Sequence, residues 1–336
     1  MNNKLSIWKI LFLILLAAGT IYILRNQAPY QNNRGKIFGT YYNITYKHNE
    51  NLEKDIKKVL GMVDNSLSPF NKNSIITAVN NNKEVVLDSF FVEVFNLASK
   101  ISERTGGAFD ITVAPLVNAW GFGFKEGTLP DSIDIDSLLK DIGYNTVSIK
   151  EGKVSKLHPN TMLDCSAIAK GYGCDAVARL LRNHRIENFM IEIGGEVVTE
   201  GRNDKGKLWN IGISKPIDDR SASNNELQEI IQLSGKAMAT SGNYRNYRIE
   251  NGRKVAHTID PRTGYPVQHS LLSATVIAEN CATADAYATA FMVMGTEKAM
   301  EICSSEEKID AFFIYSDESG NLRTSMTQGF RKYLRK

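Results

Sequence analysis

The stretch YRNYRIENGRKVAHTID, residues 244–260, decides which kind of mixed helix-and-strand fold this chain adopts. Its strand-like halves flank Asn251-Gly252, a dipeptide that favours the type I′ turn of a β-hairpin. Hairpins join antiparallel strands, whereas parallel strands need a long crossover between them, usually a helix. Further strand patterns follow without regular helical crossovers, at residues 188–201, 208–216, 227–235 and 271–280. The sequence therefore predicts an α+β fold with mixed or antiparallel sheets and packed helices.

The helices expected to pack on these sheets are marked by apolar residues at helical spacing and by glycine stop signals. They cover residues 51–67, 89–104, 167–184 and 281–295. The third contains Gly171 and Gly173 in its interior, where glycine weakens a helix. We therefore expect close backbone packing or a ligand beside these two glycines.

The N-terminus predicts a membrane anchor. Residues 10–24 are almost entirely apolar, and residues 5–24 number 20, about the length that spans a bilayer as a helix. Lys4 and Lys9 favour an orientation that leaves the rest of the chain outside the cytoplasm. A cleaved signal peptide is the alternative. On the favoured interpretation the domain lies on the periplasmic side of the inner membrane. The expected organisation is an anchor or signal segment at 1–25, a linker at 26–36 and one domain at 37–330.

Charge and cysteine content exclude some functions. The net charge is only +3, so no nucleic acid is expected as a partner. The spacing of the four cysteines matches neither a zinc site nor a compact disulfide framework. Buried free thiols are therefore favoured over disulfide pairing for Cys165, Cys174, Cys281 and Cys303.

Asp285 and Thr289 stand four residues apart in CATADAYATA, so on a helix their oxygens project from one face. Such a pair can share a hard cation such as Mg²⁺. The alternative places Asp285 in solvent and Thr289 in a core stripe, and on spacing alone that alternative is favoured.

The segment LDCSAIAKGYG, residues 163–173, predicts a site for a negatively charged ligand. Asp164 is placed at a strand end and Lys170 one turn into the following helix, whose N-terminus attracts anions. Small residues between them allow a bulky ligand to approach. The alternative is that Asp164 merely caps the helix.

Residues 106–123, GGAFDITVAPLVNAWGFG, have glycines at both ends and aromatic rings near the second end. A planar ring system can lie against such backbone. A glycine helix stop before a packed amphipathic segment explains the pattern equally well.

The turn that follows the hairpin, HTIDPRTGYPV, is stiff because Pro261 and Pro266 fix the backbone on either side of Gly264. Histidine is the side chain whose ordinary pKa lies closest to neutral pH, so His257 can act as a general base if a substrate hydroxyl lies within reach. A structural histidine at a strand end is the alternative.

Six ordered segments together resemble the ApbE family of FAD:protein FMN transferases, and they span most of the chain from about Phe38 to Gly295. The resemblance implies Mg²⁺-dependent transfer of the FMN half of FAD to a threonine hydroxyl of a target protein, with release of AMP. The implied target is a membrane electron-transport subunit. The matching segments are GAFDITVAPLVNAWGFG, DCSAIAKGYGCDAVA, IEIGGEV, ATSGNYRNY, HTIDPRTGYPV and TADAYATAFMVMG.

Carried over residue by residue, the resemblance assigns His257 to the transfer step. It implies that Mg²⁺ is held by the backbone carbonyl of Ala167 and the side chains of Asp285 and Thr289. The implied FAD contacts are Phe38, Phe70, Ala108, Phe109, Asp110, Asp164, Lys170 and Ile259.

Three positions depart from the family pattern. Phe38 stands where methionine is common, and Phe70 where tyrosine or tryptophan is usual, but a phenyl ring still stacks on flavin. Ala288 replaces a second aspartate that some relatives carry, which predicts weaker Mg²⁺ binding. Two other functions stay open: hydrolysis of FAD to FMN and AMP, and membrane-tethered flavin binding without a covalent product.

Overall fold

The computed structural model describes residues 2–25, 28–124, 134–216, 226–243, 247–250, 253–306 and 308–335. Within them, eight strands form one antiparallel sheet in the order β1-β2-β5-β6-β9-β12-β13-β14. The α+β prediction is confirmed. The strands are β1 Tyr30–Ile37, β2 Thr40–Lys47, β5 Phe189–Ile193, β6 Glu196–Glu200, β9 Lys236–Gly242, β12 Leu271–Ala278, β13 Asp310–Ser316 and β14 Leu322–Met326.

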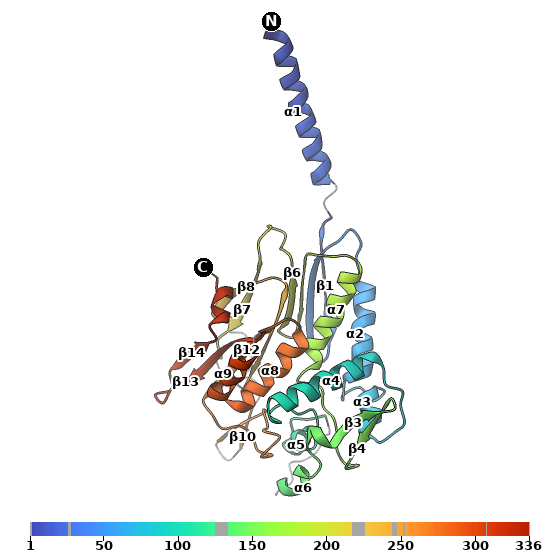
Figure 1. Ribbon diagram of the computed structural model, residues 1–336, viewed down its shortest axis with the longest axis vertical. Coiled ribbons are helices and arrows are strands. Elements are labelled where there is room, and N and C mark those ends of the chain that lie inside the picture. Colours follow the sequence, from blue (N-terminus) through green and yellow to red (C-terminus); the bar gives the residue numbers. More distant parts are fainter. Residues whose placement is uncertain are drawn as a thin grey trace.

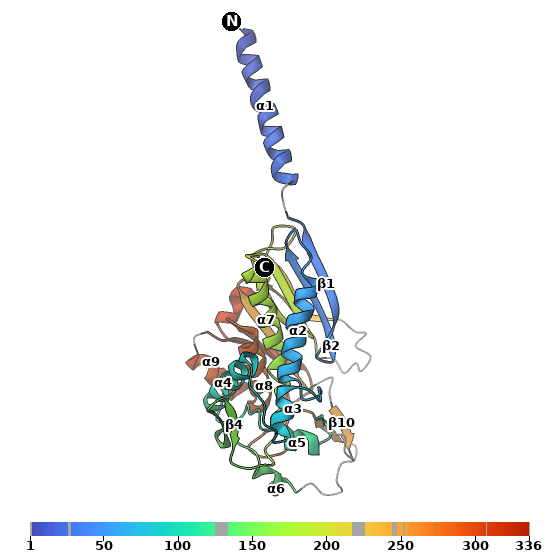
Figure 2. The ribbon, with the colours of Figure 1, turned by 90° about the vertical axis from the view of Figure 1, so that its right-hand side faces the viewer.

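Apart from α1, the long helices gather on one face of this sheet (Figures 1 and 2). The four predicted helices are present as α2 Glu53–Leu67, α4 Ser89–Arg104, α7 Ala169–Asn183 and α8 Cys281–Met294. Shorter helices are α3 Ile75–Asn80, α5 Ala114–Ala119, α6 Ile135–Leu139 and α9 Thr296–Ser305. Three separate hairpins pair β3 Val147–Lys150 with β4 Lys153–Lys156, β7 Trp209–Ser214 with β8 Leu227–Leu233, and β10 Tyr247–Glu250 with β11 Arg253–Ala256.

Both faces of the central strands are buried. On β12, Val276 packs with the helices, whereas Ile277 packs with Trp209 of the β7–β8 hairpin on the opposite face. A strand covered on both faces needs apolar residues at nearly every position, which is the pattern of LLSATVIA in β12. The sheet is therefore the middle layer of the molecule.

Strand β1 corrects the predicted linker. The linker was expected to reach residue 36, but β1 pairs with β2 from Tyr30 to Ile37. Its sequence, YQNNRGKI, is too polar to be recognised as a strand. An edge strand can be polar because it pairs on one side only, and here the Asn32 side chain donates to Asn43 on β2 at 2.9 Å.

The predicted hairpin at residues 244–260 is confirmed as the antiparallel pair β10 and β11. Its Asn251-Gly252 turn lies outside the described residues. Strand β9, just before it, was not predicted, because its sequence KAMATSG has few β-branched or aromatic residues. It nonetheless lies between β6 and β12 in the middle of the sheet.

Helix α1, Asn2–Arg25, extends away from the rest of the chain (Figures 1 and 2). Its large apolar side chains are exposed from Ile7 to Leu16. No helix within the described residues is both long and apolar enough to cross a membrane.

The four cysteines, all of which the structure describes, are buried and form no disulfide. Burial raises the pKa of the Cys165 and Cys281 thiols, which keeps them protonated at neutral pH. The expectation of buried free thiols is confirmed.

The glycines inside α7 serve close packing, as predicted. A methyl group at Gly171 would overlap the Cys281 carbonyl group at the start of α8, with its carbon 2.7 Å from the carbonyl carbon. At Gly173 the added carbon would lie 2.6 Å from Cε2 of Phe38. Glycine thus lets α8 approach α7 on one side and the turn between β1 and β2 on the other.

We expect Gly171→Ala to lower the free energy of unfolding by about 1–3 kcal/mol, because the methyl group forces α7 and α8 apart. The matched control is Gly61→Ala on α2, where nothing lies within 4 Å of the added carbon. That change should raise the free energy of unfolding by about 0.5–1 kcal/mol, since alanine favours a helix more than glycine does. Urea unfolding measures both, and equal stability of the two variants would contradict the packing argument.

Candidate active site

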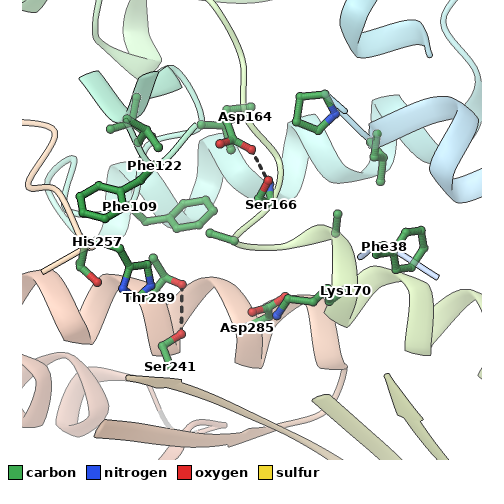
Figure 3. Close-up of a pocket in the computed structure, with 18 of the residues that line it drawn as sticks. Phe38, Phe109, Phe122, Asp164, Ser166, Lys170, Ser241, His257, Asp285 and Thr289 are labelled. Atoms are coloured by element: carbon green, nitrogen blue, oxygen red, sulfur yellow. Dashed lines mark hydrogen bonds between the residues drawn. The ribbon is translucent and has the colours of Figure 1, made fainter. Parts of the chain in front are cut away.

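One cavity of about 950 Å³ gathers every residue that the sequence analysis selected. Its walls come from the β1–β2 turn, the loop after α4, the segment before α7, the first turn of α7, one face of α8 and the turn after β11 (Figure 3). The selected residues that line it are Phe38, Phe70, Ala108, Phe109, Asp110, Asp164, Ala167, Lys170, His257, Ile259, Asp285 and Thr289.

Helix α8 presents Asp285 and Thr289 to this cavity from one face (Figure 3). Asp285 is only 2% exposed, so the alternative that placed it in solvent is wrong. Burial raises the pKa of its carboxyl group, and this is opposed by Lys170 and by the Gly171 N–H, which donates to Oδ2 at 3.0 Å. The hydroxyl of Thr289 lies 3.2 Å from that of Ser241 on β9.

Lys170 is the second residue of α7 and forms an ion pair with Glu196, the first residue of β6. Burial lowers the pKa of Lys170, but Asp285 and Glu196 together raise it above its usual range. Burial raises the pKa of Glu196 to about 7, although Lys170 acts in the opposite direction. A lysine that stays charged therefore stands between two buried carboxyl groups.

Asp164 lies in the loop before α7 and does not cap that helix. Helix α7 begins at Ala169, and the residue at its N-cap position is Ile168, whose side chain makes no capping bond. The Asp164 carboxylate instead accepts the Ser166 N–H at 2.8 Å. Burial raises its pKa against that hydrogen bond. The capping alternative is therefore wrong, and Asp164 lines the cavity.

The Ala108-Phe109-Asp110 segment is held by hydrogen bonds to Asp110. The Asp110 carboxylate accepts the N–H of Thr112 at 2.8 Å, its hydroxyl at 2.7 Å, and the N–H of Tyr144 at 2.7 Å. Burial raises the pKa of Asp110, which these donors oppose. Gly106 and Gly107 follow the end of α4, in agreement with the alternative that they are a helix stop. Phe109, two residues later, still lines the cavity.

The turn after β11 is stiff, as predicted. Arg262 holds Asp260 with two hydrogen bonds of 2.8 Å, and Thr258 donates to Asn243 at 2.6 Å. Gly264 has a φ of +80°, and a Cβ at this position would meet the side chains of Ile135 and Leu116, so glycine is required there. Trp120 donates to the Gly264 carbonyl at 2.9 Å.

His257 stands at the start of this turn, one residue after β11, and lines the cavity. The ring of Phe122 meets the imidazole edge to face, with 6.4 Å between ring centres. A fixed imidazole with a surface on the cavity suits a general base better than a purely structural histidine.

Phe38 and Phe70, the two aromatic residues that depart from the family pattern, lie in different surroundings: Phe38 in a tight turn and Phe70 on the surface. Phe38 and Gly39 form the two-residue turn between β1 and β2 with φ of +50° and +72°. A positive φ is unusual for a bulky residue and marks local strain. Phe70 is 66% exposed, and its ring meets Phe124 edge to face at 6.2 Å.

Sequence reasoning missed Ser241, Thr240 and Glu196. Ser241 and Thr240 line the cavity from β9, and Glu196 pairs with Lys170 behind its wall. Their only signal was membership of ATSGNYRNY and IEIGGEV, which matched the family without indicating a chemical role.

The described residues contain no group of three or more His, Cys, Asp or Glu side chains that could hold a metal ion. The possible donors on the cavity face of α8 are the Asp285 carboxylate and the Thr289 hydroxyl. Such a sparse oxygen set suits only a cation that takes its other ligands from backbone, phosphate and water, as Mg²⁺ does.

Comparison with known proteins places these features in a family. A sequence model of the ApbE family matches residues 38–313. The chain belongs to the ApbE family. The FAD:protein FMN transferase of Haemophilus influenzae is 34% identical over 317 residues, which cover 89% of this chain and 90% of that protein. That of Vibrio cholerae is 35% identical over 314 residues, covering 90% and 92%.

The ApbE fold is also shared in three dimensions. The solved flavin transferase ApbE from Vibrio cholerae matches with a TM-score of 0.81 at 33% identity, covering 91% of this chain and 100% of that chain. The resemblance stated from the sequence motifs is thus confirmed, and so is the ApbE-like α+β fold.

Proposed function

We propose that this ApbE protein transfers the FMN moiety of FAD to a threonine hydroxyl of a target protein and releases AMP. The observation that carries the proposal is the single cavity that gathers Phe109, Lys170, His257 and Asp285 from distant parts of the chain. Relatives named FAD:protein FMN transferase align over 89% of the chain or more, which supports the same activity. The target is proposed to be a membrane electron-transport subunit.

The chemistry is a displacement at phosphorus. The threonine oxygen bonds to the phosphorus on the FMN side of the pyrophosphate, and the bond from that phosphorus to the bridging oxygen breaks. AMP leaves with the bridging oxygen, and the hydroxyl proton goes to a base. His257 suits that role because the stiff turn holds it at the cavity surface. Lys170 offers its positive charge to the phosphate oxygens.

Mg²⁺ is proposed to be held by the Ala167 carbonyl oxygen and the side chains of Asp285 and Thr289. These residues line the same cavity and offer oxygen ligands, which fit a hard cation and not a thiophilic one. When bound, Mg²⁺ neutralises charge on the pyrophosphate. The Ser241 hydroxyl, 3.2 Å from that of Thr289, helps to orient the Thr289 oxygen.

The function is tested by incubating the protein with FAD, Mg²⁺ and an acceptor that carries a Ser/Thr-Gly-Ala-Thr site. We expect AMP and flavin that stays on the acceptor after denaturation. Free FMN with AMP, at the same rate with and without acceptor, would support FAD hydrolysis instead. Tight flavin binding without AMP would support a non-catalytic flavin-binding protein.

His257→Ala should bind FAD with nearly unchanged affinity but transfer FMN about 10²–10⁴-fold more slowly, the usual contribution of a general base. The control is His269→Ala, because His269 lies outside the cavity and contacts the Met292 carbonyl oxygen at 2.8 Å. Fluorescence quenching measures FAD binding, and covalent flavin measures transfer. Unchanged transfer in His257→Ala would remove this residue from the mechanism.

Removal of the metal, or of its carboxylate ligand, should stop the reaction. We expect excess EDTA, and separately Asp285→Asn, to slow AMP release by at least about 100-fold, since a bound metal contributes several kcal/mol to such a step. Asparagine still accepts the Gly171 N–H but lacks the charge. Glu301→Gln on the exposed side of α9 is the control for loss of one charge. AMP release that survives EDTA would rule out the metal-dependent mechanism.

We further propose that the N-terminal helix anchors the protein in the inner membrane, with the catalytic domain in the periplasm. The support is the apolar run of residues 10–24 and the exposure of the α1 side chains from Ile7 to Leu16. The full chain should stay with membranes through a carbonate wash, and removal of residues 2–25 should release it. Protease added to spheroplasts should digest the domain; protection there would contradict the orientation.

A further inference from the structure

Glu196 is a charged group behind the cavity wall, and nothing above explains its role. It follows the Gly194-Gly195 turn, whose φ values of +64° and +102° only glycine adopts readily. The turn brings Glu196 to the first position of β6. The residue is 2% exposed and does not line the cavity. It therefore makes no direct contact with a bound ligand, and its contact with the cavity passes through another side chain.

That side chain is Lys170. Its ammonium forms an ion pair with Glu196 Oε1, and the two side chains are 31% and 3% exposed. Lys170 also lines the cavity, and its end lies beside Asp285 (Figure 3). Lys170 thus spans the distance from a buried carboxylate to the surface where a ligand would bind.

The arrangement is costly for stability. One ammonium lies with two buried carboxyl groups, and the second oxygen of Glu196 has no hydrogen-bond partner among the described residues. A buried polar atom without a partner destabilises the folded state, and a buried ion pair seldom exceeds an apolar replacement in stability. Packing alone therefore gives no reason for a glutamate at this position.

Glu196 can favour the reaction by restricting the Lys170 side chain to one orientation. A lysine side chain has many rotamers, and it stabilises a phosphate best when it already points to the right place. Asp285 cannot provide this fixation alone, because on the mechanism proposed above it also serves the metal.

We propose that Glu196 is a positioning residue, which fixes the Lys170 ammonium at the cavity wall for the developing charge on the FAD phosphates. This inference rests on the proposed transferase function and gives the IEIGGEV segment a role. Glu196 does not line the cavity, so its positioning effect passes through Lys170.

The test is a double-mutant cycle of Glu196→Gln and Lys170→Gln in the full chain, with AMP release and FAD dissociation constants as readouts. Glu196→Gln should lower kcat about tenfold, the equivalent of one charge-assisted contact. Its FAD dissociation constant should change by less than about threefold, because the loss of order at Lys170 weakens binding while removal of a negative charge behind the cavity favours the anionic ligand. In the Lys170→Gln background the same change should cost less than about twofold.

Equal losses in both backgrounds, or unchanged kcat in Glu196→Gln, would overturn the inference. So would a weaker FAD affinity with kcat unchanged. Thermal unfolding checks that each variant folds. If Glu196→Gln does not fold, Glu196→Asp takes its place in the cycle, because aspartate keeps the charge but has a shorter reach, and an unchanged kcat in that variant would refute the fixation. A wild-type chain that releases no AMP would refute the transferase function instead.

Discussion

Helices α7 and α8 touch at Gly171, and this contact sets both the packing of the core and the charges of the cavity. The absent side chain lets the Cys281 carbonyl approach, while the Gly171 N–H donates to Asp285. Lys170, one residue earlier, comes to the same carboxyl group. This one backbone contact fixes the Cys281 carbonyl, the Asp285 carboxyl group and Lys170. The charges of the cavity therefore depend on the packing of the core.

Much of this could be predicted from the sequence because the information was local. Helices α2, α4, α7 and α8 follow from apolar spacing and glycine stops, and the β10–β11 hairpin follows from alternation around Asn251-Gly252. The residues selected through the family motifs all line one cavity. Where the pattern was weak, the prediction failed: β1 is a polar edge strand, and β9 has small residues that become a strand only between β6 and β12.

The rest of the site depends on contacts between distant segments. Asp285 looked exposed by its spacing alone, yet α7 covers it. Asp164 looked like a helix cap, yet the chain turns through Ser166 before α7 starts. Glu196 and Ser241 gained roles only from partners 26 and 48 residues away. Sequence periodicity describes one element at a time, so it cannot reveal such pairs.

Phe38 illustrates how the backbone and the side-chain environment of one residue can favour different amino acids. Its φ of +50° lies in the left-handed region, which asparagine and glycine adopt more readily than phenylalanine. The missing side chain of Gly173 leaves room for the Phe38 ring. The Phe38 ring packs against the core as well as lining the cavity, so packing and the cavity together favour a bulky apolar side chain at a position where the backbone favours a small polar one.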